Sequence, residues 1–92
     1  MLEGQVAIVT GGSRGIGRAI AERLGTLGAQ VVVTATSEQG AERAQSELGE
    51  AGVQARGIAL DVTETEAIDP FIKQVQSEVG APAILVNNAG IT

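Results

Sequence analysis

Thr10-Gly11-Gly12-Ser13-Arg14-Gly15-Ile16-Gly17 is the stretch that decides the fold. It directly follows the apolar run Val6 to Val9 and directly precedes a helical pattern that begins at Arg18. Glycines let the backbone turn sharply and approach a ligand closely, and the free N–H groups and positive dipole at the start of the next helix favour an anion. A strand, a glycine turn and a helix in this order predict a phosphate-binding turn rather than an ordinary βα turn without a ligand.

The composition limits what the chain can be. Its 92 residues suggest one small domain with an aliphatic core, because Phe71 is the sole aromatic residue. The formal net charge of −5 argues against nucleic acid or an anionic membrane as partners. The absence of Cys and His excludes disulfides and removes the commonest general base and metal ligand. The same absence leads us to expect no metal site. No apolar run approaches the ~20 residues of a membrane span, and we expect a cytoplasmic protein.

Hydrophobic periodicity predicts four strands separated by three helices. The strands are expected at 5–10, 30–35, 54–61 and 83–87. The first helix follows the glycine turn and ends near Gly28, and the second begins after a Ser37 cap and ends at Gly52. The side chains expected to face the sheet are Ile16, Ile20, Leu24 and Leu27 in the first helix, Ala41, Ala44, Leu48 and Ala51 in the second, and Ile68, Phe71, Ile72, Val75 and Val79 in the third.

The start of the third helix is open to two interpretations. Thr63 and Glu66 match a capping box, which places the start near Glu64 and a bend at a solvent-facing Pro70. Alternatively, Asp69 caps the helix and Pro70 is its first residue. We favour the longer helix, because Ile68 continues the apolar stripe.

The order βαβαβαβ with short connections predicts a parallel sheet with right-handed crossovers. We expect the strand order 3-2-1-4, with the first two helices on one face and the third on the other. This is half of a Rossmann-type doubly wound α/β sheet, so residues 1–92 form a single dinucleotide-binding half-domain. In such folds the ligand lies where the strand order reverses, which is between strands 1 and 4. The half present here contains the phosphate turn and the adenosine side of that site.

The end of the second strand decides between NAD and NADP. A NAD site usually has Asp or Glu there to bind the ribose 2′-hydroxyl, whereas this chain has Thr34-Ala35-Thr36-Ser37. An end that is rich in hydroxyls and lacks a carboxylate admits a 2′-phosphate, and Arg14 is a cation able to reach it. We therefore infer NADP(H) as the cofactor. The alternatives are that Arg14 is merely solvated and that Ser37 is merely a helix cap, although Ser37 can serve both purposes.

Two further segments lie at strand ends. Asp61-Val62 ends the third strand beside the expected adenine position, where Asp61 either accepts from an adenine amino group or caps the next helix. Asn87-Asn88-Ala89-Gly90 follows the fourth strand. Paired amides there can tie neighbouring strand ends together, and Ala89-Gly90 lets a ribose or ring pack against the backbone. Asn-Asn is also a plain turn signal, and its position at the switch point raises its significance.

Thr10 to Gly17, Asp61-Val62 and Leu85 to Gly90 together resemble the short-chain dehydrogenase/reductase family. Within it, 34–38 and 87–92 are most similar to the bacterial 3-oxoacyl-[acyl-carrier-protein] reductases. The resemblance implies NADPH-dependent reduction of a 3-oxoacyl thioester of acyl-carrier protein in fatty-acid synthesis, by a larger and usually tetrameric parent. It implies cofactor contacts at Gly11, Ser13, Arg14, Gly15, Ile16, Gly17, Thr36, Asp61, Val62, Asn88, Ala89 and Gly90.

The chain departs from the family pattern in two ways. Ala83 stands where family members commonly have Asp. The catalytic Ser and the Tyr-x-x-x-Lys motif of the family lie beyond the part that these 92 residues match. The chain has no tyrosine, and Lys73 is no substitute because it lies on a helix with no partner tyrosine. We therefore expect no catalytic residue in this chain and no hydride transfer by it alone.

Three hypotheses follow for the function of these 92 residues. They are the cofactor-binding N-terminal half of a reductase, a weak binding module for NADP(H) or an adenosine 2′-phosphate, or a self-associating scaffold. In the last case the bare outer edge of the strand 83–87 pairs with a second copy to form a homodimer.

Overall fold

The computed structural model describes residues 1–12 and 15–88. In these ranges the elements follow one another as β1 Val6–Thr10, α1 Gly15–Thr26, β2 Gln30–Ala35, α2 Glu38–Glu50, β3 Ala55–Ala59, the 3₁₀ turn η1 Thr65–Ala67, α3 Ile68–Glu78 and β4 Pro82–Asn87. No helix within the two described ranges is long and apolar enough to cross a membrane.

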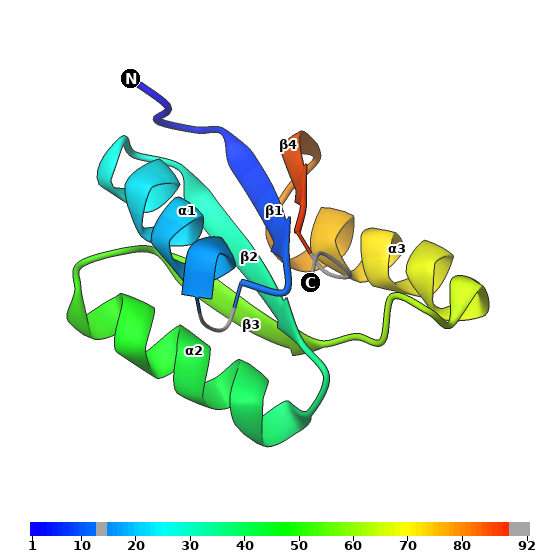
Figure 1. Cartoon of the computed structure of the whole chain (residues 1–92). Helices are drawn as coiled ribbons and strands as arrows, with labels where there is room; N and C mark the ends of the chain where they lie inside the picture. Colours follow the sequence, from blue (N-terminus) through cyan, green and yellow to red (C-terminus); the bar gives the residue numbers. More distant parts are fainter. Residues whose placement is uncertain (13–14, 89–92) are drawn as a thin grey trace.

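The four strands form one parallel sheet in the order β3-β2-β1-β4. Figure 1 shows α1 and α2 together on one face of this sheet and α3 on the opposite face. The predicted α/β class, the strand order and the distribution of the helices are therefore confirmed. The strand order reverses its direction between β1 and β4, so the carboxyl ends of these two strands mark the switch point of the sheet.

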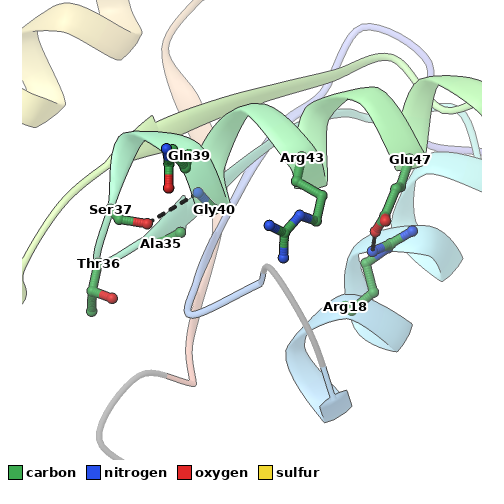
Figure 2. A pocket seen from close by; sticks show the side chains of 8 residues that line it. All are labelled: Arg18, Ala35, Thr36, Ser37, Gln39, Gly40, Arg43 and Glu47. Carbon is green, nitrogen blue, oxygen red and sulfur yellow. Dashed lines mark hydrogen bonds and ion pairs between the residues drawn. The ribbon is translucent and has the colours of Figure 1, made fainter.

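The second helix begins where Ser37 was expected to cap it. The Ser37 hydroxyl oxygen accepts a hydrogen bond from the Gly40 N–H at 3.0 Å (Figure 2), which satisfies one of the free donors of the first turn. The inward positions Ala41, Ala44 and Leu48 are buried as predicted. Ala51 was predicted to face the sheet but lies exposed, because it is the C-cap residue and no longer follows the helical periodicity.

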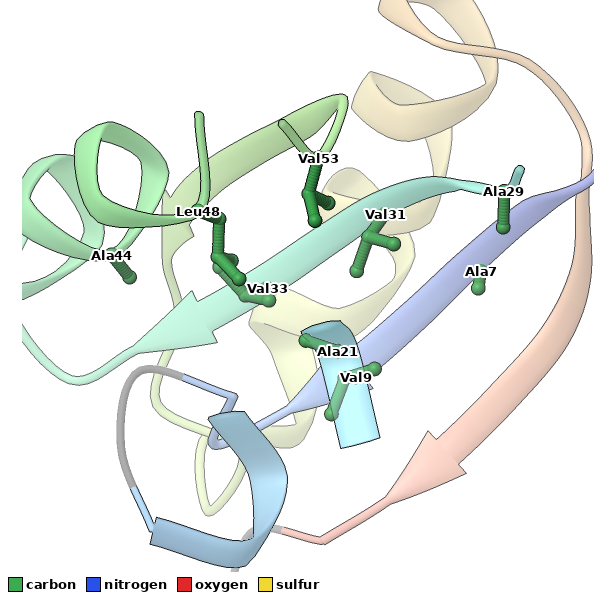
Figure 3. Close-up of a cluster of buried hydrophobic side chains, with 9 residues drawn as sticks. All are labelled: Ala7, Val9, Ala21, Ala29, Val31, Val33, Ala44, Leu48 and Val53. Carbon is green, nitrogen blue, oxygen red and sulfur yellow. The ribbon is translucent and has the colours of Figure 1, made fainter. Parts of the chain in front are cut away.

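Apolar side chains fill both faces of the sheet. Every residue of β1 is buried, as expected for a central parallel strand. Alternate strand residues separate into two clusters, one under each helical layer. The cluster under α1 and α2 (Figure 3) contains Ala7, Val9, Ala21, Ala29, Val31, Val33, Ala44, Leu48 and Val53. The cluster under α3 contains Val6, Ile8, Val32, Leu60, Phe71 and Val75.

The first helix packs on the sheet through smaller residues than predicted. Gly17 and Ala21 are its buried positions, while Ile20 and Leu24 lie at the margin of the core. Ile16 was expected on the inward side, yet its side chain is 73% exposed. The small residues let the helix approach the sheet closely, which turns Ile16 at the open N-terminal end away from the core.

The segment before α3 also differs from the prediction. Thr63 and Glu66 do not form a capping box, because the Thr63 N–H donates to Asp61 rather than to Glu66 and the N-cap residue is Glu64. Helical structure begins with η1 and continues into α3 at Ile68 without a side-chain cap. Pro70 is thus an exposed residue of the first turn of α3, where its missing N–H costs no helical hydrogen bond.

Candidate functional site

A network of hydrogen bonds joins the carboxyl ends of β1, β2 and β4. The Thr10 hydroxyl lies 3.2 Å from Asn87 Oδ1 and accepts from the Asn88 N–H at 3.0 Å. The Gly11 N–H donates to the buried Thr34 hydroxyl at 3.0 Å. Asn88 Nδ2 donates to the Gly11 carbonyl at 3.3 Å. The two asparagines therefore tie neighbouring strand ends together, as the sequence predicted.

Glycine is required at Gly11, Gly15 and Gly17 of the turn for different physical reasons. Gly11 and Gly15 have φ angles of 67° and 65°, in the left-handed region that residues with a Cβ rarely adopt. Gly17 has an ordinary helical backbone, but a Cβ there would lie 2.5 Å from the Gly11 carbonyl oxygen and 2.6 Å from Asn88 Nδ2. Glycine at this position allows the start of α1 to lie directly against the ends of β1 and β4.

Thr36 borders two of the hollows that open at this edge of the sheet. We call the first the β3 hollow; its volume is about 210 Å³ and its lining includes Gly11, Thr36, Asp61 and Val62. We call the second the α2 hollow; it has a volume of about 460 Å³. The α2 hollow is lined by Arg18, Ala35, Thr36, Ser37, Gln39, Gly40, Arg43 and Glu47 (Figure 2).

The α2 hollow carries two cations and one anion. Arg18 Nη1 lies 2.6 Å from Glu47 Oε1, which joins α1 to α2. Arg18 Nε is buried without a hydrogen-bond partner and lies 4.0 Å from Glu22 Oε1. No carboxylate occurs between Ala35 and Ser37. The balance at the end of β2 therefore favours an anionic ligand.

Asp61 is exposed at the end of β3 and is engaged by its own loop. Its Oδ1 accepts from the Thr63 hydroxyl at 2.6 Å and from the Thr63 N–H at 3.0 Å. These two hydrogen bonds hold the pKa of the Asp61 carboxyl below its ordinary value. The carboxylate thus stabilises the turn that follows β3, and the same side chain borders the β3 hollow.

We predict that the Thr63 hydroxyl accounts for most of the lowered Asp61 pKa. A carboxyl whose pKa is lowered on folding stabilises the fold above its unfolded pKa, and this contribution is lost as the pH falls through the lowered value. In Thr63→Ala, the Asp61 pKa should rise toward the ordinary 3.8, as measured by NMR titration of the side-chain carboxyl carbon. An unchanged pKa in this variant would show that the hydroxyl is not the cause.

The structure brings most of the predicted site residues to one edge of the sheet. Gly11, Thr36, Asp61 and Val62 border the β3 hollow, and Thr36 and Ser37 border the α2 hollow. Gly15 and Ile16 are exposed at the start of α1, whereas Gly17 is buried. The predicted residues Ser13, Arg14, Ala89 and Gly90 lie outside the described residues.

Other residues of this edge could not be recognised as site residues in advance. Arg43 and Glu47 belong to a charged stretch that is typical of a solvated helix face, and their place beside Thr36 depends on how α2 packs. Thr10 and Thr34 had a weak signal, since each is a polar residue near the end of an apolar strand. In 1–12 and 15–88, no group of three or more His, Cys, Asp or Glu side chains could hold a metal ion.

Comparisons with known proteins agree with this arrangement. The sequence profile described as short chain dehydrogenase matches residues 5–92. The 3-oxoacyl-[acyl-carrier-protein] reductase FabG of Vibrio harveyi is 57% identical over 91 residues, which are 99% of this chain and 36% of that protein. The FabG proteins of Pseudomonas aeruginosa and Escherichia coli K12 are 52% and 51% identical, over 99% and 98% of this chain and 37% and 36% of their own lengths.

The chain therefore spans little more than a third of the length of these relatives. The matched region includes the strand ends and all but the first four residues. On the profile match and this identity, the chain belongs to the short-chain dehydrogenase family.

Proposed function

We propose that these 92 residues are the NADP(H)-binding N-terminal portion of a reductase that acts on 3-oxoacyl-[acyl-carrier-protein] thioesters. The observation that carries the proposal is that Gly11 of the glycine turn and Thr36 at the carboxylate-free end of β2 line the same hollow, the β3 hollow. Identity of 50–57% to 3-oxoacyl-[acyl-carrier-protein] reductases supports the substrate class.

The described residues fit the adenosine half of the cofactor. The N-terminal end of α1 supplies free N–H groups and a positive dipole for the diphosphate, and Gly17 keeps that end against the strand ends. The β3 hollow, with Asp61 and Val62 on its border, suits the adenine ring. The α2 hollow lies on the other side of Thr36 and suits a ribose substituent.

The choice of NADP over NAD rests on charge. A ribose 2′-phosphate would be repelled by a carboxylate at the end of β2, and Thr36 and Ser37 occupy that end instead. Hydroxyls donate to phosphate oxygens, and arginines bind phosphate through a bidentate fork. We therefore assign the 2′-phosphate to the α2 hollow side of Thr36, with Arg14 as a further ligand.

The chemistry of the whole protein requires residues that these 92 do not include. When bound, NADPH supplies a hydride to the substrate carbonyl. The chain has neither tyrosine nor histidine to donate the accompanying proton. Its own residues therefore bind and orient the cofactor, the acyl-carrier-protein thioester is a partner of the longer protein, and a cytoplasmic location follows from that role.

Calorimetric titration of the purified chain with NADP and with NAD tests this proposal. We expect NADP to bind more tightly than NAD. In Arg14→Ala, NADP affinity should fall about tenfold or more, because a charge-assisted hydrogen bond contributes roughly 1.5–3 kcal/mol, while NAD affinity should stay constant. Equal NADP affinity in the variant and in the unsubstituted 92-residue chain would show that Arg14 is not part of the site. Absence of NADP binding to the unsubstituted chain would contradict the proposed function.

A second candidate function is self-association, and the exposure of β4 favours it. Leu85 is 64% exposed, and β4 pairs only with β1 among the described strands. A bare strand edge invites pairing with another chain, most simply with a two-fold mate. We expect light scattering at high protein concentration to give the mass of a dimer. A strictly monomeric mass across the concentration range would count against this candidate.

A further inference from the structure

The α2 hollow holds a cation that neither the family resemblance nor the glycine turn explains. Arg43 is exposed on α2 and lines the hollow. Among the residues that the structure describes, no hydrogen bond or ion pair engages its guanidinium. In Figure 2 the side chain leaves α2 on the side that faces the N-terminal end of α1. An arginine held on a helix and directed into a hollow is available for an anion.

Helical periodicity places Arg43 in line with the rest of the hollow. Gly40, Arg43 and Glu47 follow one another at spacings of three and four residues, so they share one face of α2. Gly40 lies at the Ser37 cap, where a Cβ would lie 3.2 Å from the Ser37 hydroxyl oxygen and 3.3 Å from Ala35 Cβ. The absence of a side chain there keeps α2 close to the end of β2. Arg43 therefore lies one helical turn beyond Gly40, on the face of α2 that lines the hollow.

Arg18 and Arg43 differ in whether a carboxylate pairs with their charge. Glu47 lies against Arg18 Nη1 at 2.6 Å and offsets much of its charge. Arg43 has no such partner in the described part of the chain, so its positive charge is not offset by an ion pair within the lining of the hollow.

We propose that Arg43 binds the 2′-phosphate of NADP from α2 and so contributes to the preference for NADP over NAD. The inference rests on the proposed function, and it adds a specificity-determining residue outside the glycine turn. Glu47 has the opposite effect, because its carboxylate lines the same hollow and repels the phosphate.

Calorimetric titration of NADP, NAD and adenosine 2′,5′-bisphosphate into a set of variants tests the proposal. In Arg43→Ala, we expect about tenfold weaker binding of NADP and of the bisphosphate, with NAD unchanged. Arg43→Lys should recover part of the loss, because lysine restores the charge without the bidentate fork. In Glu47→Gln, NADP should bind roughly threefold more tightly, because one repulsive charge is removed.

Arg23→Ala is the matched control, since it removes the same charge from an exposed position of α1 that does not line the hollow. Its NADP affinity should equal that of the parent chain. Equal NADP affinity in Arg43→Ala and Arg23→Ala, or an equal loss of NADP and NAD in Arg43→Ala, would overturn the role of Arg43 and leave the proposed function standing. If the unsubstituted 92-residue chain bound none of the three ligands, both the role of Arg43 and the proposed function would be overturned.

Discussion

Gly17→Ala is expected to reduce NADP affinity by roughly a hundredfold, which is the loss of about two charge-assisted hydrogen bonds from the turn to the phosphates. The new Cβ would lie 2.5 Å from the Gly11 carbonyl oxygen and 2.6 Å from Asn88 Nδ2. Neither distance is tolerated, so α1 must move away from the strand ends and the bond from Asn88 to Gly11 must lengthen. The N–H groups at the start of α1, which we propose bind the phosphates, move with the helix.

The measurement is calorimetric titration at a temperature where circular dichroism shows the variant to be folded. Gly49→Ala is the matched control, because nothing lies within 4 Å of a Cβ at that position of α2. NADP affinity should be unchanged in this control. If the folded Gly17→Ala protein bound NADP as tightly as the parent, the close contact of α1 with the strand ends would not be what forms the phosphate site.

The second large effect concerns stability. In Gly57→Ala, the added Cβ would lie 2.0 Å from the Ala41 carbonyl oxygen and 2.7 Å from its carbonyl carbon. Both are backbone atoms of α2, so the helix must shift on β3. The Gly57 N–H also donates to Gln45 Oε1 at 2.9 Å, a bond that covers part of the outer edge of the sheet. We expect the free energy of unfolding to fall by about 2–3 kcal/mol.

Urea denaturation followed by circular dichroism measures this loss. The same methyl group in Gly49→Ala meets no neighbour and should raise the free energy of unfolding by about 0.5–1 kcal/mol, because alanine favours helix over glycine. Changes of opposite sign in the free energy of unfolding of Gly57→Ala and Gly49→Ala would confirm that close packing of α2 on β3 needs Gly57. A Gly57→Ala midpoint at or above that of the parent would show that this contact relaxes without cost.

The strand order and the layers were predictable because they depend on apolar runs and short connections that are visible in the sequence. β1 and β2 are continuous apolar runs, and the short connections with right-handed crossovers leave one arrangement of the sheet. The edge position of β3 agrees with the polar residues Gln54 and Arg56 in and beside this strand. These features depend on hydrophobicity and connectivity, which local sequence carries.

The errors lie where packing competes with local pattern. Ile16 fits the apolar side of α1, but the approach of Gly17 to the sheet turns it outward. Thr63 and Glu66 match a capping box, but the nearby Asp61 carboxylate takes both Thr63 donors first. The orientation of Ile16 depends on the distance between α1 and the sheet. The Thr63 outcome depends on whether Asp61 or Glu66 accepts from its N–H, which the local pattern does not rank.

The site was predictable only in part for the same reason. The glycine turn, the carboxylate-free end of β2 and the paired asparagines are local motifs, and the structure brings Gly11, Thr36 and Asp61 to one hollow. Arg43 has no local motif, since it resembles any exposed helical arginine. Its position beside Thr36 is a consequence of tertiary structure.

Amide chemical-shift mapping tests the central claim most directly, which is that this edge of the sheet binds NADP through its adenosine half. The ¹⁵N-labelled chain is titrated with NADP and, separately, with NAD. We predict that the largest shifts occur at Gly11, Gly15, Gly17, Thr36 and Asp61, that residues of α3 such as Lys73 and Gln76 shift little, and that Thr36 and Arg43 distinguish NADP from NAD. Shifts confined to the α3 face, or no shifts with either nucleotide, would contradict the account.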